Sequence, residues 1–168
     1  MKTYFLMLAA ACALMTQPKQ QKRSAGVHEH GAGKLDIAME GLKGSLVFEI
    51  PMESLTGFEH EAKTAADKKK MVEAEAAIRS KMGQMVLLPA PSACTISVSE
   101  VEAERHGNHS EMHVHGAISC KQPVKGDIRF AFGKVFPGIH KVAVQYIDGA
   151  VQSGVVVEHD RGVLKVAK

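Results

Sequence analysis

The chain has 168 residues, of which 45% are hydrophobic and 23% are charged, a balance typical of a globular domain with a real core. Its formal net charge of +3 is too small to indicate a nucleic-acid partner. With no tryptophan, two tyrosines and six phenylalanines, it also offers few aromatic rings on which bases could stack, so we expect no nucleic-acid binding.

The N-terminus has the features of an export signal. Lys2 supplies a positive charge, and an uncharged, mostly apolar run over residues 4–15 is too short to span a membrane. Cleavage is expected after Ala13 or, because Ala9-Ala10-Ala11-Cys12 resembles a bacterial lipoprotein box, before a lipidated Cys12. A lipid anchor is the only membrane attachment that we expect. The predicted divisions are a signal peptide, a polar linker and a metal-binding domain: residues 1–15, 16–26 and 27–168.

A β-hairpin is predicted at the start of the domain. Apolar residues alternate over 35–39 and again over 46–50, and a glycine-bounded turn at 41–44 separates the two runs. Residues 51–61 are expected to form an irregular connection.

One amphipathic helix is predicted next. Thr64 and Asp67 have the spacing of a capping box. Apolar residues then recur at helical spacing, which indicates core packing rather than a copper-binding stripe. These residues are Met71, Ala74, Ile78, Met82 and Met85. Pro89 and Pro91 are expected to end this element.

The cysteines predict a second hairpin. Strands are expected over 95–101 and 112–119, and antiparallel pairing of Cys94 with Cys120 would place Ile96 opposite Ile118. That register also sends the histidines of the second strand to the polar face, with irregularity expected near residues 100–102. In an oxidising compartment we favour a disulfide between the two cysteines, and two thiolate metal ligands are the alternative.

The remaining chain is rich in predicted strands. Apolar alternation recurs over 128–132, 142–146 and 151–157, with a turn signal at Asp148-Gly149 and a last short strand after 160–162. We therefore expect an α+β fold, a single domain rich in antiparallel β-sheet with one main helix.

Two clusters hold six of the nine histidines, and each contains a His-x-His pair. Residues i and i+2 of a strand point the same way, so each pair is suited to one metal ion. The clustered histidines are His28, His30, His106, His109, His113 and His115. We expect His106 and His109 to lie on a loop.

The sequence leaves the ligand sets open. The two pairs at 28–30 and 113–115 would together make a tetrahedral zinc site, and the four histidines of 106–115 would make a local one. Glu29 and Glu111 are further candidate oxygen ligands. Histidines with carboxylates and no methionine cluster favour zinc, with copper or nickel as the alternative.

The other histidines carry weaker signals. His60 is either a metal ligand or a partner of its own loop, and we favour the loop. His140 and His159 are expected to be ordinary surface residues. No catalytic motif is found, so we expect no enzyme, and a zinc hydrolase with Glu59 as its base is a minor alternative.

Several short segments, in order along the chain, resemble the ZrgA-like zinc-binding proteins of the bacterial periplasm. They are His28-Glu29-His30-Gly31, Gly57-Phe58-Glu59-His60, Ala93-Cys94, the histidine-rich segment, Cys120 with Pro123, Phe136-Pro137-Gly138-Ile139 and Val144-Gln145. The central segment carries only four histidines, fewer than in many relatives.

This resemblance implies a zinc-binding protein of the Gram-negative periplasm that supports a zinc ABC importer or its binding protein. It supports the clustered histidines as ligands and Cys94–Cys120 as a disulfide. A copper or nickel chaperone that uses the same histidines is the alternative function, and an envelope protein with incidental histidines is a further one.

Overall fold

The computed structural model describes residues 30–107 and 109–166. The predicted signal peptide and linker, Cys12, His28 and Glu29 lie outside these residues. None of the helices in the described part combines the length and the apolar character that crossing a membrane requires. The elements in chain order are β1 (Ala32–Glu40), β2 (Lys43–Pro51), α1 (Met52–Thr56), α2 (Ala65–Met85), β3 (Val86–Leu87), a 3-10 turn (Ala90–Ser92), β4 (Thr95–His106), β5 (His109–Ser119), β6 (Gly126–Phe130), α3 (Phe132–Val135), β7 (Lys141–Asp148), β8 (Val151–Glu158) and β9 (Val163–Val166).

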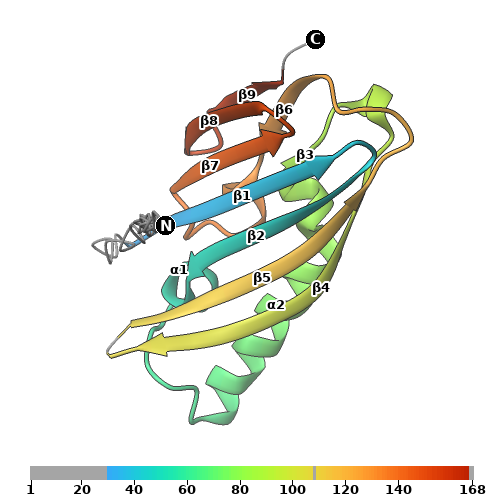
Figure 1. The fold of residues 1–168 in the computed structure, drawn as a ribbon. Coiled ribbons are helices and arrows are strands. Elements are labelled where there is room, and N and C mark those ends of the chain that lie inside the picture. Colours follow the sequence, from blue (N-terminus) through green and yellow to red (C-terminus); the bar gives the residue numbers. More distant parts are fainter. Residues whose placement is uncertain (1–29, 108, 167–168) are drawn as a thin grey trace, which may run out of the picture.

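Six strands form the main sheet, in the order β4-β5-β2-β1-β7-β8, and a smaller sheet has the order β3-β6-β9 (Figure 1). The pairings are antiparallel, as expected for a fold rich in antiparallel sheet, except that β1 runs parallel to β7. The fold is otherwise the expected α+β type. Local hairpin patterns carry no information about this pair, because about a hundred residues separate its two strands.

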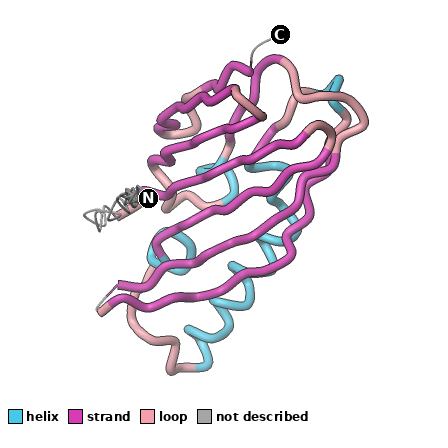
Figure 2. The backbone as a smooth tube through the Cα atoms, viewed as in Figure 1, coloured by secondary structure: helices cyan, strands magenta, loops and turns pink. Residues whose placement is uncertain are grey.

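Helix α2 covers one face of the main sheet, and no element of residues 30–107 and 109–166 covers the opposite face, which we call the open face (Figures 1 and 2). The alternation of β1, β2 and β5 sends one set of side chains into a single core shared with α2. Leu35, Phe48 and Val114 are fully buried from the sheet side, and Ile78 and Met82 from the helix. The alternate residues of the same strands therefore face away from α2, and this open face carries the histidines of β5.

The predictions for the first hairpin and for the helix are confirmed. β1 and β2 pair around a tight turn that starts at Gly41. Helix α2 begins at the predicted capping box, in which Thr64 and Asp67 bond each other's backbone N–H groups. These hydrogen bonds lower the pKa of Asp67 from its ordinary value. Residues 51–61 are more regular than expected, since they contain α1.

The β4–β5 hairpin has the predicted register and is longer than predicted. Cys94 and Cys120 form a disulfide, and Ile96 pairs with Ile118. The irregularity is a shift of register between Val98 and Glu100, slightly earlier than expected. The expectation of a histidine-bearing loop is wrong, because pairing continues to His106 and His109 at the hairpin tip. Toward this tip the alternation of apolar residues becomes less regular, while the hydrogen-bonded pairing of β4 with β5 continues. A prediction from hydrophobic alternation alone therefore ended both strands too early.

Candidate metal centre

Strand pairing brings His30 and the first histidine of β5 to the same end of the main sheet. β2 is flanked by β1 and β5, so the start of β1, the end of β2 and the start of β5 lie side by side (Figure 1). If the two ladders are extended two residues past Pro51, Glu53 falls opposite His30 on one side and opposite His109 on the other. The register of the three strands thus brings the ends of β1, β2 and β5 together, and α1, which follows β2 directly, carries Glu53 to this place.

A short helix and a glycine turn bring in a second carboxylate. Helix α1 ends at Gly57, whose φ of +82° places it in the left-handed region that favours glycine, and its N–H donates to the Glu53 carbonyl. The chain then reverses toward β5. There the Ser110 hydroxyl donates to the backbone carbonyl of Glu59 over 3.0 Å. This bond fixes Glu59 beside the start of β5.

A second glycine, Gly138, allows α1 to pack closely against the loop that precedes β7. A Cβ at Gly138 would lie 2.9 Å from the Cα of Ser54 and would collide with the Ser54 carbonyl. Only glycine permits this close approach without a shift of backbone. Gly138 therefore contributes to the position of Glu53, although it lies far from it in sequence.

Four side chains converge at this end of the sheet, and we call them the strand-end cluster: His30, Glu53, Glu59 and His109. His30 Nδ1 contacts Glu53 Oε2 and lies 3.5 Å from Glu59 Oε1, while His109 Nδ1 lies 3.2 Å from Glu59 Oε2. Ligand atoms of His30 and the two glutamates lie within 4.8 Å of one another, close enough to hold one metal ion. The His30 and His109 ring centroids are 6.5 Å apart.

The cluster is open to solvent. The side chains of His30, Glu53 and His109 are 64%, 44% and 44% exposed, and that of Glu59 is 21% exposed. Imidazole nitrogen and carboxylate oxygen are both zinc ligands, and an exposed set of this kind leaves room for water or an incoming group. The arrangement therefore suits a metal ion that enters and leaves.

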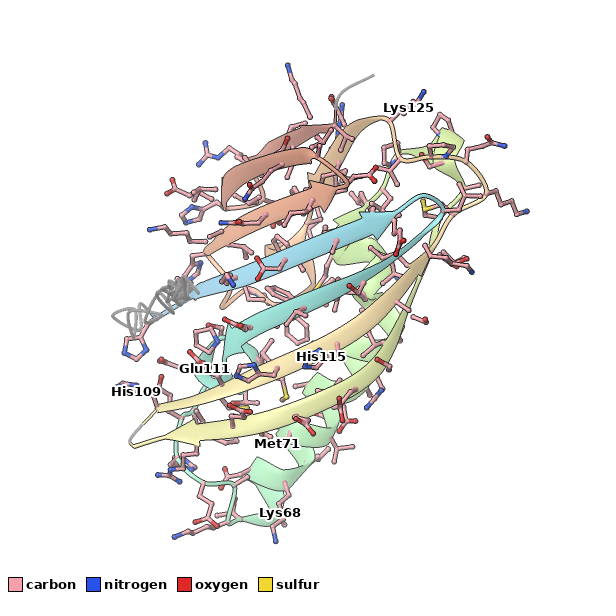
Figure 3. All side chains as sticks on the ribbon, in the orientation of Figure 1. Lys68, Met71, His109, Glu111, His115 and Lys125 are labelled. Carbon is pink, nitrogen blue, oxygen red and sulfur yellow. A yellow bond between two sulfur atoms is a disulfide. The ribbon has the colours of Figure 1, made fainter. Side chains whose placement is uncertain are left out.

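A second group, the sheet-face cluster, lies further along β5 and comprises Glu104, Glu111 and His113. The Nε2 atom of His113 lies 3.6 Å from Glu104 Oε2 and 3.7 Å from Glu111 Oε2. His115 follows on the same face of β5, as the sequence predicts (Figure 3). Glu111, one of the further candidate oxygen ligands, lies beside the predicted histidine.

The other candidate histidines are placed differently. His60 stacks on Phe58 with ring centroids 4.7 Å apart, and its Nδ1 lies 3.0 Å from the Glu61 carbonyl oxygen, which matches the favoured loop role. His106 occupies the last position of β4, and its side chain is outside the described part. His140 and His159, which the sequence pattern treats as isolated, stack with ring centroids 5.6 Å apart.

Sequence reasoning did not identify the carboxylates of the strand-end cluster as ligands. Glu53 belongs to the segment expected to be irregular, and Glu59 was considered only as a hydrolytic base. With 18 acidic residues in the chain, no local pattern singles out these two. For Glu59 the available signal was its place in the Gly57-Phe58-Glu59-His60 segment.

Comparison with known proteins identifies the family. No curated protein matches the chain. A family model described as "ZrgA family zinc uptake protein" matches residues 27–166. This range includes the strand-end cluster, the sheet-face cluster and the two cysteines of the disulfide. The chain therefore belongs to the ZrgA family of zinc uptake proteins.

Proposed function

We propose that this protein captures zinc in the periplasm of a Gram-negative bacterium and supports its delivery to a zinc importer. The observation that carries the proposal is the strand-end cluster, in which two histidines and two glutamates from four separate segments converge within a few ångströms. Membership of a zinc uptake family supports zinc as the cargo. The export signal expected at residues 1–15 supports the periplasmic location.

The ligand chemistry favours zinc over copper. Carboxylate oxygens make up half of the strand-end cluster, whereas monovalent copper prefers thiolate and thioether sulfur. The cysteines at 94 and 120 are joined to each other and do not offer thiolates. Divalent copper and nickel also bind imidazole, so metal content is the measurement that separates the three metals.

The first test is the metal content of the protein purified from the periplasm without a tag or added metal. We expect about one or more zinc ions per chain, and we expect a His30→Ala/His109→Ala variant to retain fewer. A His60→Ala/His159→Asn variant is the matched control, because it also removes two exposed histidines. Copper or nickel in place of zinc, or equal zinc in both variants, would contradict the proposal.

The uptake role needs a test in cells. A strain that lacks the protein should grow more slowly than its parent when zinc is chelated, and the wild-type gene should restore growth. Restoration by the His30→Ala/His109→Ala variant should be weaker. Unchanged growth of the deletion strain under zinc starvation would favour an envelope role in which the histidines are incidental.

A further inference from the structure

The environment of His113 differs from that of an ordinary surface histidine. Its side chain is 19% exposed, and its Nε2 atom is out of contact with solvent and has no hydrogen-bond partner in the described part of the chain. A buried ring nitrogen without a hydrogen bond is costly unless another ligand satisfies it. The carboxylate oxygens of Glu104 and Glu111 lie 3.6 and 3.7 Å from this nitrogen, just beyond hydrogen-bond distance.

The strand register surrounds this imidazole with carboxylates. Glu104 and Glu111 are directly opposite each other on β4 and β5, an arrangement that like charges disfavour. Glu49 of β2 and Glu102 of β4 are the cross-strand partners of His113 itself. A divalent cation among these groups would offset the repulsion between the carboxylates.

We propose that the sheet-face cluster binds a second zinc ion, with His113 Nε2 and carboxylate oxygens of Glu104 and Glu111 as ligands. The inference rests on the proposed function, since it assumes that the chain carries zinc. Two ligand atoms each about 2.1 Å from a tetrahedral zinc are about 3.4 Å apart. The observed separations of 3.6 and 3.7 Å from His113 Nε2 to the two carboxylates are close to that spacing.

The two clusters are too far apart to share one ion. His109 and His113 are four residues apart on β5, and a strand rises about 3.3 Å per residue, so their Cα atoms are about 13 Å apart. Both residues lie on the same face of the strand, as do Glu111 and His115 (Figure 3). One strand therefore presents two successive zinc sites on the same face of the sheet.

The test uses the full chain as the cell produces it. The purified protein is stripped of metal with a chelator and dialysed against buffered zinc, and the zinc ions bound per chain are then counted. We expect His113→Ala and Glu104→Gln/Glu111→Gln each to bind one zinc fewer than wild type. The matched control is His159→Asn, which removes an exposed histidine that lies outside both clusters. We expect that variant to retain the full count, and circular dichroism to show all variants folded.

The combination with the strand-end variant His30→Ala/His109→Ala separates the two proposals. Adding His113→Ala to it should remove a further zinc ion. If His113→Ala binds as much zinc as wild type, or if the combined variant binds no less than the strand-end variant alone, the second site is refuted. If the strand-end variant keeps its full count while His113→Ala loses one zinc, the sheet-face site stands and the strand-end assignment fails.

Discussion

The disulfide between Cys94 and Cys120 should supply a large share of the stability of this domain. The two cysteines are 26 residues apart in sequence and are adjacent to the first pair of the β4–β5 hairpin, Thr95 and Ser119. For a closed loop of this size, the loss of chain entropy in the unfolded state corresponds to about 3.5 kcal/mol at 25 °C. At about 3 °C per kcal/mol for a domain of this size, reduction should lower Tm by about 10 °C.

The assay is urea unfolding of the same chain in its oxidised and reduced forms, since this comparison leaves every side chain in place. The free energies of unfolding, extrapolated to water, should differ by about 3 to 4 kcal/mol. A Cys94→Ala/Cys120→Ala variant should show no response to reductant. Equal stability of the two forms of the wild-type chain would refute the entropic argument.

The same variant tests whether the disulfide supports the metal centre. The cross-link closes one end of the hairpin, whereas His106 and His109 pair at the other end. Pairing of β5 with β2 and the Ser110–Glu59 hydrogen bond hold the histidine-bearing end independently of it. The folded Cys94→Ala/Cys120→Ala variant should therefore bind as much zinc as wild type, and a loss of zinc without unfolding would contradict this account.

Three further predictions concern single positions. Thr64→Ala should lower the free energy of unfolding by about 1 kcal/mol, because it removes the side-chain acceptor at the start of α2, and urea unfolding will measure this. Burial and the neighbouring Asp148 raise the pKa of Tyr146 to about 12. The pKa of an unfolded tyrosine is near 10, so the free energy of unfolding should fall by up to about 3 kcal/mol as pH rises from about 10 to 12. Tyr146→Phe should abolish this part of the fall. Gly138→Ala should cost about 1 to 3 kcal/mol and weaken zinc binding in dialysis, because the new Cβ displaces α1 at Ser54.

Local patterns in the sequence were sufficient for the hairpins. In the β4–β5 hairpin, alternation combined with the two cysteines predicted the pairing of Ile96 with Ile118 and the placement of the second strand's histidines on the polar face. Both signals act between residues close in sequence, and a shift by one residue would turn every buried side chain outward. The capping box at Thr64 is equally local, since its residues are three positions apart.

The strand-end cluster was beyond such reasoning, because it depends on strand order. His30, Glu53 and His109 come together only because β2 pairs with β1 on one side and with β5 on the other. Hairpin patterns predict neighbours along the chain, but the β2–β5 pairing joins strands about sixty residues apart. Histidine spacing predicted metal-ligand chemistry, which stays a prediction, and topology determined which carboxylates lie beside the histidines.

Where zinc binds as we propose, the position of the clusters favours a cargo ion over a structural one. The hydrophobic core is continuous from β1, β2 and β5 to α2, and the disulfide already joins the β4–β5 hairpin, so we expect the domain to fold without a metal. Structural zinc sites are closed by four protein ligands, usually with thiolates, whereas His30 and Glu53 are largely exposed and offer imidazole and carboxylate. A site of this kind at the rim of a rigid sheet can bind and release an ion with little change elsewhere. Removal of zinc should therefore leave the circular dichroism spectrum of the domain unchanged, and unfolding on chelation would show that the metal is structural.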